Sequence, residues 1–301
     1  MDSITLRQLR YFEALAQHGH FGRAAEACAI SQPALSLQMK ALEDAVGAPL
    51  VEKGARQVRL TDLGEAFAVR TRDILRAVDE LSEFTQARVG PFLGRFRLGI
   101  IPTVAPYLLP GVIKALSQRY AGLDVLPREA ITQKLIANLI DAKLDAAIVA
   151  LPVSEPSLHE EPLFDEEFLL VRPASDARKP VPDPAHLREM RLLLLEEGHC
   201  FRDQALSYCR LTPSAPRSLM EGSSLSTLVQ MVAAGIGVTL IPEMAVGIET
   251  RSASVAVARL PSPRPARKIG MLWRRTSPIA GHLTQVSALV RKAARDLNRK
   301  S

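Results

Sequence analysis

The sequence predicts a chain of two parts: a winged helix-turn-helix with a long linker helix, and then an α/β domain of two lobes. Residues 1–60 contain three short amphipathic helical patterns followed by two short strand patterns. Residues 61–88 carry one continuous helical pattern, and strand and helix patterns alternate over the rest of the chain. A chain of 301 residues is long enough to bury a core in each part. We therefore expect a DNA-binding domain at 1–60, a linker helix at 61–90 and a regulatory domain at 91–301.

The helical patterns at the start of the chain predict a helix-turn-helix. The second helix, at 21–28, is short, and a tight turn at 29–31 leads into the third. Ser31 is a favoured N-cap residue, Pro33 suits a first helical turn and Gly47 is typical of a helix end. The third helix is therefore expected to run between Ser31 and Gly47. Its polar side chains lie outside its apolar stripe and are expected to face a major groove; they are Ser36, Gln38 and Lys40.

A basic turn follows the third helix. The segments "PLVE" (49–52) and "QVRL" (57–60) predict two short strands, which flank a tip that contains Lys53 and Arg56. A wing of this kind suits contacts with the DNA backbone or the minor groove. Basic and acidic side chains nearly balance in the N-terminal domain, so DNA binding is predicted from the placement of a few residues and not from bulk charge.

Residues 61–88 predict one long helix, for which Thr61 is a suitable N-cap. An apolar stripe runs along it and contains Leu63, Phe67, Ile74, Val78, Leu81 and Phe84. A free helix of this length would expose the stripe to water, so we expect a second copy of the chain to cover it. Packing against the helix's own chain is the alternative. A homodimer would also present two recognition helices to an operator with two-fold symmetric half-sites.

The remaining two thirds of the chain predict a mostly parallel sheet with helices on its faces. The strand patterns lie at 95–101, 123–129, 145–151, 168–173, 191–197, 236–242 and 267–275. We assign about 91–164 and 267–301 to lobe I and about 165–266 to lobe II. Ligands of such folds lie beyond the strand ends, which predicts a cleft between the lobes.

Composition limits the possible functions. Apolar residues make up 47% of the chain and charged residues 23%, which is ordinary for a globular protein. The apolar runs are too short to cross a bilayer, so we expect a cytoplasmic protein with reduced thiols and no membrane partner. Three cysteines do not make a disulfide framework. The sequence also lacks a phosphate-binding loop and a dinucleotide fingerprint, and we expect no cofactor.

The N-terminal motif resembles the winged helix-turn-helix of the LysR-type transcriptional regulators. That family combines Phe-x-x-Ala-Ala with Ser-Gln-Pro-x-Leu-Ser-x-Gln, and then Leu-Glu, Leu-Thr and Gly. The matching residues are Phe21, Ala24, Ala25, Ser31, Gln32, Pro33, Leu35, Ser36, Gln38, Leu42, Glu43, Leu60, Thr61 and Gly64. Because "MVAAGIGVTLIPE" (231–243) is also typical of the family, the resemblance spans the whole chain.

The family resemblance implies the fold and the partners. The regulatory domain is expected to have a periplasmic-binding-protein-like fold, and double-stranded DNA is the expected partner. The implied DNA-binding residues are Phe21, Ser31, Gln32, Pro33, Ser36, Gln38, Lys40, Lys53 and Arg56. The resemblance further implies a homotetramer built as a dimer of dimers, and RNA polymerase as a partner. Regulators of this family ordinarily bind a small metabolite in the cleft, which is one candidate function for this chain.

Two of the three cysteines lie in "LLEEGHCFRDQALSYC" (194–209). Together with "IIPTVAPYLLP" (100–110) and "EAITQ" (129–133), this segment resembles the hydrogen-peroxide sensors of the LysR type, the OxyR group. By that resemblance Cys200 is the peroxidatic cysteine and Cys209 the resolving one, joined in a reversible disulfide. The resemblance also implies a peroxide pocket, formed by Thr103, Thr132, His199, Asp203 and Arg267.

These residue types suit thiolate chemistry. An ordinary thiol titrates near ~8.5, and only the thiolate attacks the O–O bond. Cys200 is expected to open a helix, whose free N–H groups favour an anion. His199 and Arg202 add donors nearby, and Arg267 is a permanent cation able to lower the pKa of the thiol. Attack on peroxide yields a sulfenic acid, which a second thiol converts to a disulfide.

The spacing of the two cysteines predicts a conformational switch. If 200–209 form one helix, the cysteines lie roughly 13 Å apart along its axis and point to opposite sides. A disulfide requires Cα atoms within about 7 Å, so the helix has to unravel before they can join. Because oxidation would then be stoichiometric signalling, we do not expect an enzyme.

Other interpretations of the cysteines stay open at this point. Both could be inert core residues, and a zinc site could use His199, Cys200 and Cys209, although no Cys-x-x-Cys pair supports it. A thiol peroxidase would use the same cysteine pair. We expect no metal, and we expect Cys28 to be structural.

Overall fold

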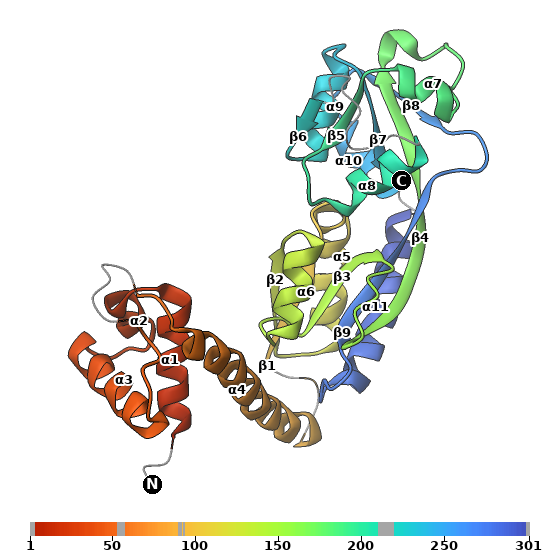
Figure 1. Cartoon of the computed structure of the whole chain (residues 1–301). Coiled ribbons are helices and arrows are strands. Elements are labelled where there is room, and N and C mark those ends of the chain that lie inside the picture. Colours follow the sequence, from red (N-terminus) through yellow and green to blue (C-terminus); the bar gives the residue numbers. More distant parts are fainter. Residues whose placement is uncertain (1–3, 53–57, 90–91, 93, 210–219, 299–301) are drawn as a thin grey trace. The chain divides into compact units, whose positions relative to one another are not determined.

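The computed structural model describes residues 4–52, 58–89, 92, 94–209 and 220–298. The chain divides into two compact units, Met1–Arg88 and Val89–Ser301. Figure 1 traces both units along the sequence.

Three helices surround the core of the first unit; they are α1 (Leu6–His18), α2 (Phe21–Ala27) and α3 (Gln32–Val46). The predicted start of α3 is confirmed, because the Ser31 hydroxyl accepts a hydrogen bond from the Ala34 N–H. Its predicted end is confirmed as well, because Gly47 caps it at φ 79, in the left-handed region. The core is fully buried at Phe12, Leu15, Leu35 and Leu42.

The linker helix α4 spans Asp62–Val89. The predicted N-cap is confirmed, because the Gly64 N–H donates to Thr61 Oγ1 at 3.0 Å. Phe67 packs edge-on against Phe12, with ring centroids 5.3 Å apart, so this part of the apolar stripe is covered by its own chain. Further along the helix the stripe is open: Ile74 is 46% exposed and Leu81 is 64% exposed. The Phe84 side chain is outside the described part of the chain.

The predicted wing is described only at its base. Val51 and Leu60 form an antiparallel bridge, and the Glu52 N–H donates to the Arg59 carbonyl at 2.9 Å. Lys53 and Arg56, the predicted basic tip, lie outside the described residues.

The second unit is built on one twisted, mixed sheet. Its strands are β1 (Gly94–Ile100), β2 (Leu123–Glu129), β3 (Ala146–Leu151), β4 (Leu158–Pro173), β5 (Leu192–Leu195), β6 (Met220–Gly222), β7 (Val238–Pro242), β8 (Val255–Arg259) and β9 (Ala266–Arg274). Their order is β2-β1-β3-β9-β4-β7-β5-β6, with β8 also paired to β4.

The prediction of a mostly parallel sheet is wrong in its centre. Strands β2, β1 and β3 are parallel in one lobe, and β6, β5 and β7 are parallel in the other. The strands that join the two sets, β4, β9 and β8, pair only in the antiparallel sense. Parallel neighbouring strands need helical crossovers between them. Strands β4 and β9 instead pass directly from one lobe to the other, in opposite directions, and therefore pair as antiparallel neighbours.

Strand β4 belongs to both lobes. It pairs with β9 from Leu158 to Glu167, and with β7 from Phe168 onward (Figure 1). Lobe I, as used below, contains β1–β3, β9 and the first part of β4, and lobe II contains β5–β8 and the second part of β4. The helices of the unit are α5 (Ala105–Arg119), α6 (Thr132–Ile140), α7 (Pro184–Glu189), α8 (Cys200–Tyr208), α9 (Leu225–Ala233), α10 (Val246–Glu249) and α11 (Ala280–Asn298).

A buried hydrogen-bond cluster connects the lobes. The Tyr107 hydroxyl, on α5 of lobe I, donates to Glu249 Oε1 at 2.6 Å. The Ser226 hydroxyl, on α9 of lobe II, donates to Glu249 Oε2 at 2.5 Å. Burial and the neighbouring Glu249 carboxylate raise the pKa of Tyr107, so the phenol keeps its proton and remains a donor.

Candidate functional site

The backbone before α8 brings Cys200 to the first position of the helix. Strand β5 ends at Leu195, and Gly198 then adopts φ +94, which L side chains rarely adopt. A Cβ at position 198 would also lie 3.2 Å from Ile131 Cδ1. His199 is the N-cap and makes no side-chain cap, so Cys200 begins α8 beside free helical N–H groups.

A narrow pocket lies at this helix start, between the two lobes. It has about 180 Å³ of empty space, although none of it is wide enough for a water molecule. The lining residues are Ile101, Pro102, Thr103, Ile131, Thr132, Gly198, His199, Cys200 and Phe201. Four predicted site residues therefore meet here, namely Thr103, Thr132, His199 and Cys200. Thr132 Oγ1 is buried and has no hydrogen-bond partner among the described residues, so it is available to a molecule in the pocket.

Arg267 reaches this pocket through Thr103. It does not line the pocket and its side chain is fully buried. Its Nη1 donates to Thr103 Oγ1 at 2.7 Å, and its Nη2 donates to the Thr103 carbonyl at 3.1 Å. The guanidinium carbon also lies 5.4 Å from the centroid of the Phe201 ring, next to Cys200. Arg267 therefore does not line the pocket itself but contacts Thr103, which does.

Glu166, which the sequence did not single out, holds Arg267 from the other side. Glu166 Oε2 accepts from Arg267 Nε at 2.8 Å, and Oε1 accepts the Met244 N–H at 3.0 Å. Both charged side chains are buried, so the pair neutralises charge that water cannot reach. Its signal in the sequence is weak, because Glu166 is one of several acidic residues in "LFDEEF" (163–168).

His199 is shifted toward its neutral form. Burial lowers the pKa of the imidazole, although Glu196 and Glu129 act in the opposite direction. A lowered pKa leaves the ring mostly neutral at pH 7, with one nitrogen as donor and the other as acceptor.

Cys209 is the C-cap of α8 and is fully buried. The nine-residue helix between the two cysteines is therefore confirmed. Gln204 Oε1 and Tyr208 Oη are buried on this helix without a hydrogen-bond partner among the described residues. Such atoms oppose folding, so α8 is held mainly by apolar packing of residues such as Phe201 and Ala205.

Two polar residues of the first turn of α8 do not join the pocket. Asp203, a predicted pocket residue, is exposed and does not line it. Arg202 was expected to add a donor to the site, which is wrong. Its Nη1 instead donates to the Leu195 carbonyl at 2.8 Å and pairs with Glu221 at 2.7 Å, so it ties α8 to the neighbouring strands.

Most of the predicted DNA-binding residues on or beside α3 are exposed. Ser31, Gln32, Pro33, Ser36 and Lys40 are exposed on or beside α3, and Gln38 is half-buried. Phe21 is half-buried and packs against the core, which leaves less of it for DNA. Sequence reasoning missed Leu37, which is 66% exposed on the same helix. The sequence did contain a signal for this exposure, because Leu37 lies outside the apolar stripe of the third helix.

The other sites considered from the sequence have ordinary explanations. Cys28 is half-buried against the first core, and burial raises the pKa of its thiol. Among the described residues no group of three or more His, Cys, Asp or Glu side chains could hold a metal ion. Within the same residues no helix is long and apolar enough to cross a membrane.

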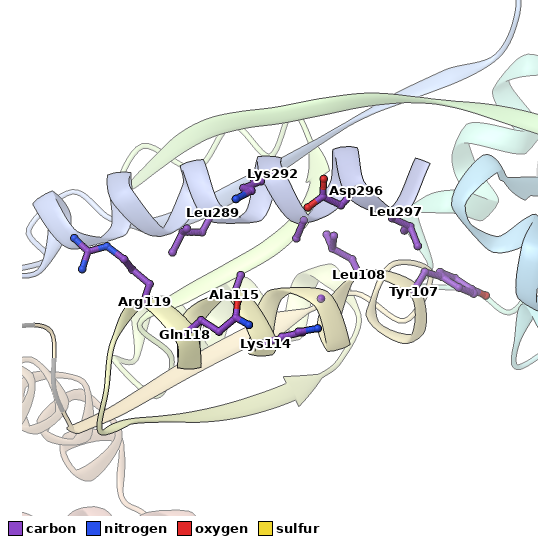
Figure 2. A pocket seen from close by; sticks show the side chains of 12 residues that line it. Tyr107, Leu108, Lys114, Ala115, Gln118, Arg119, Leu289, Lys292, Asp296 and Leu297 are labelled. Carbon is purple, nitrogen blue, oxygen red and sulfur yellow. The ribbon is translucent and has the colours of Figure 1, made fainter. Parts of the chain in front are cut away.

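A second hollow, a groove of about 660 Å³, lies between α5 and α11 (Figure 2). Lys114, Arg119 and Lys292 line it together with Asp296 and several apolar residues. It shares no lining residue with the pocket at Cys200.

Comparisons with known proteins agree over the whole chain. Residues 6–65 match the family model "Bacterial regulatory helix-turn-helix protein, lysR family", and residues 90–295 match "LysR substrate binding domain". A "Probable hydrogen peroxide-inducible genes activator" from Streptomyces viridosporus is 44% identical, covering 97% of this chain and 95% of the relative. The "DNA-binding transcriptional dual regulator OxyR" from Escherichia coli K12 is 39% identical, covering 96% of this chain and 95% of the relative.

Solved structures of similar proteins have the same architecture. Full-length OxyR from Pseudomonas aeruginosa, a cysteine-to-aspartate variant, superimposes with a TM-score of 0.77 at 36% identity, covering 97% of this chain and 96% of that one. A Corynebacterium glutamicum OxyR cysteine-to-serine mutant with hydrogen peroxide bound has a TM-score of 0.67 at 34% identity, covering 97% and 93%. The chain thus belongs to the LysR family of bacterial regulatory helix-turn-helix proteins.

Proposed function

We propose that this protein is a hydrogen-peroxide-sensing, DNA-binding transcription regulator of the OxyR type. The observation that carries the proposal is the position of Cys200, which begins α8 in a pocket with Thr103, Thr132 and His199 while Cys209 ends the same helix. The full-length similarity to hydrogen peroxide-inducible activators points in the same direction. A regulator of bacterial genes acts where the chromosome is, so we also propose a cytoplasmic location.

The proposed chemistry begins with the Cys200 thiolate. Its sulfur attacks one oxygen of hydrogen peroxide, so an S–O bond forms and the O–O bond breaks. Sulfur is oxidised to sulfenic acid, the peroxide is reduced, and the departing hydroxide takes a proton from solvent and leaves as water. The Cys209 thiol then attacks the sulfenic sulfur, and a second water leaves as the disulfide forms. Thr103 and Thr132 supply hydroxyls to the bound peroxide.

The pocket has to widen before peroxide enters. It has no free room for a water molecule, and hydrogen peroxide is larger than water. His199 precedes α8 in irregular backbone, so we propose that its side chain moves to admit the oxidant. Asp203 is exposed and does not line the pocket, so we propose no contact between its side chain and the peroxide.

The proposed switch is the unwinding of α8. Its buried orphan atoms, Gln204 Oε1 and Tyr208 Oη, gain hydrogen bonds with water or with other groups when the helix opens. The unwound segment lets Cys209 reach Cys200, and the disulfide then holds the new conformation. Each protein molecule reacts once before a reductant resets it, so the role is signalling and not turnover.

For DNA recognition we propose that α3 enters the major groove and that the wing with Lys53 and Arg56 contacts the adjacent backbone or minor groove. Ser31, Gln32, Ser36 and Lys40 supply polar contacts from the exposed face of α3 and its cap, and the half-buried Gln38 supplies a further one. Leu37 projects from the same face, where an apolar side chain suits a thymine methyl group.

We further propose that the exposed stripe of α4, with Leu63, Ile74 and Leu81, pairs with a second copy of the chain. The dimer fits an operator with two-fold symmetric half-sites. A dimer of dimers, and contact with RNA polymerase, are proposed from family membership.

Peptide mass spectrometry tests the proposed function. Purified reduced protein receives a brief, near-stoichiometric pulse of hydrogen peroxide, and the thiols are then trapped. We expect a Cys200–Cys209 disulfide within seconds, with Cys28 still free. If Cys200 and Cys209 both stay reduced, the sensor function is wrong, and a metabolite-responsive regulator becomes the better assignment. Sustained consumption of peroxide with a reductant would instead indicate a thiol peroxidase.

A further inference from the structure

We propose that Glu166 is a positioning residue for peroxide reduction: it fixes the Arg267 guanidinium so that Thr103 donates its hydroxyl proton into the Cys200 pocket. This inference rests on the proposed function, because it names a residue that serves the same site from outside the pocket.

The Glu166 carboxylate is held between two donors from different lobes. Oε2 accepts from Arg267 Nε at 2.8 Å, and Oε1 accepts from the Met244 N–H of lobe II at 3.0 Å. Its side chain is 4% exposed and that of Arg267 is fully buried, so water does not compete for either group. Each carboxylate oxygen thus has its own buried donor, which fixes the orientation of the carboxylate relative to the Arg267 guanidinium.

Arg267, held in this way, determines the role of Thr103. Arg267 Nη1 donates to Thr103 Oγ1 at 2.7 Å, and an arginine can only donate. The Thr103 hydroxyl accepts that bond and keeps its own proton for another acceptor. Within the described parts of the chain this hydroxyl donates to no protein atom, and Thr103 lines the pocket beside Cys200. The proton therefore points to the place that an oxidant would occupy.

A directed hydroxyl proton helps the proposed reaction at one step. When the Cys200 sulfur bonds to one peroxide oxygen, the O–O bond breaks and negative charge develops on the departing oxygen. A hydrogen bond from Thr103 stabilises that charge until the hydroxide is protonated by solvent and leaves as water. Glu166 contributes only through the geometry of Arg267 and Thr103, and it does not touch the reacting atoms.

The Glu166→Gln substitution separates this role from simple packing. Glutamine has nearly the same volume, but its amide combines one acceptor oxygen with an NH2 donor group. The two carboxylate oxygens of Glu166 face the Arg267 Nε–H and the Met244 N–H. In either orientation of the glutamine amide, its NH2 group would therefore face one of these two N–H donors. The Glu167→Gln substitution is the matched control, because Glu167 is the next residue on β4 and pairs at the surface with Arg259 and Arg264.

The test compares two reactions of Cys200 in the full-length protein. Stopped-flow mixing gives the rate constant for oxidation by hydrogen peroxide, and iodoacetamide alkylation gives a rate that depends on the thiolate but not on peroxide geometry. We expect Glu166→Gln to slow oxidation by ~10-fold or more, with alkylation changed less than ~3-fold. Glu167→Gln is expected to match the wild type in both reactions.

Each other outcome has a distinct meaning. If the wild type itself reacts slowly with peroxide, the proposed function fails. If the wild type reacts rapidly and Glu166→Gln reacts at the same rate, or if oxidation and alkylation fall in parallel, the positioning role is wrong. Should Glu166→Gln not fold, Glu166→Asp answers the same question, because it keeps the charge but is one methylene too short to reach both donors. An unchanged ratio of the two rates in that variant would also overturn the proposal.

Discussion

Cys200 and Cys209 lie at opposite ends of one helix: Cys200 is the first residue of α8 and Cys209 is its C-cap. At ~1.5 Å per residue the two positions are roughly 13 Å apart along the axis. A disulfide requires Cα atoms within about 7 Å, so the cysteines cannot join while α8 is intact. In the proposed mechanism, formation of the disulfide therefore requires α8 to open.

Replacing Cys209 with alanine should stop the proposed reaction at its first product. Cys200 should still react with peroxide, but its sulfenic acid has no partner and should persist long enough for trapping by dimedone. The buried site loses its sulfur, so we expect about 1 kcal/mol lower stability. Mass spectrometry after a peroxide pulse checks the adduct, with Cys28→Ala as the control. A Cys28–Cys200 disulfide in the Cys209→Ala protein would contradict the assignment of the resolving cysteine.

The Thr103→Val substitution should affect both stability and rate. Valine has a similar shape but no hydroxyl, so the buried Arg267 Nη1 loses its acceptor, at a cost of about 1–3 kcal/mol. Peroxide oxidation of Cys200 should slow as well, while Thr103→Ser should recover most of the rate because it keeps the hydroxyl. Thermal unfolding and stopped-flow oxidation measure the two effects. Equal oxidation rates for the valine and serine variants would remove the hydroxyl from the mechanism.

His199 should make the folded protein sensitive to acid. Burial lowers its pKa in the folded state, so the unfolded chain binds the proton more readily. Its contribution to stability is therefore complete above the unfolded pKa of about 6.5, and it is lost as the pH falls through the lower folded value. The midpoint of thermal unfolding should fall more between pH 7.5 and 5.5 in the wild type than in His199→Gln, with all buffers at equal ionic strength.

His186 provides a control, because its pKa is shifted in the opposite direction to that of His199. Its hydrogen bond with Asp183 raises its pKa, so its small contribution is present at low pH and is lost as the pH rises. The His186→Gln substitution should therefore slightly steepen the loss of stability toward acid. Parallel unfolding curves for the wild type and His199→Gln would show that His199 is not shifted.

The exposed stripe of α4 should hold the dimer together. Replacing both Ile74 and Leu81 with glutamate places two charges in a surface that needs apolar contact, and we expect a shift from dimer or tetramer to smaller species. Val69→Glu is the matched control, because Val69 is 51% exposed on the same helix but outside the stripe. Sedimentation equilibrium measures the mass. An unchanged mass in the double variant would place the dimer interface elsewhere.

Leu37 and Lys40 should contribute differently to DNA binding. Lys40→Ala should weaken binding on all sequences and reduce the salt slope by ~1, as expected for a phosphate contact. Leu37→Ala should weaken binding to a duplex selected from a random pool, while it leaves the salt slope and the binding of unrelated DNA unchanged. Fluorescence anisotropy at several salt concentrations measures both. A changed salt slope in Leu37→Ala would argue against a thymine contact.

The sequence was most informative where local rules decide the structure. The ends of α3 follow from Ser31 and Gly47, and the start of α8 follows from the glycine before His199. These signals depend on a few neighbouring residues and need no knowledge of the tertiary fold.

The predictions failed where the structure depends on distant partners. The first part of β4, "LHEEPLFDEE" (158–167), is polar enough to conceal a strand, and only its pairing with β9 makes it one. The link from Glu166 to Arg267 spans about a hundred residues of sequence and had no local signal. Arg202 is a cation next to Cys200 in the sequence and so resembles a site residue. Its contacts with Leu195 and Glu221, however, turn its side chain toward the neighbouring strands.

The narrowness of the pocket around Cys200 has a consequence for selectivity. Cys200 is half-buried, and the pocket beside it has no room even for a water molecule, so a large electrophile must displace more side chains than a small one to reach the sulfur from the pocket. An oxidant of two heavy atoms needs the smallest displacement of side chains to reach the sulfur. The narrow pocket therefore favours small oxidants over large ones at Cys200.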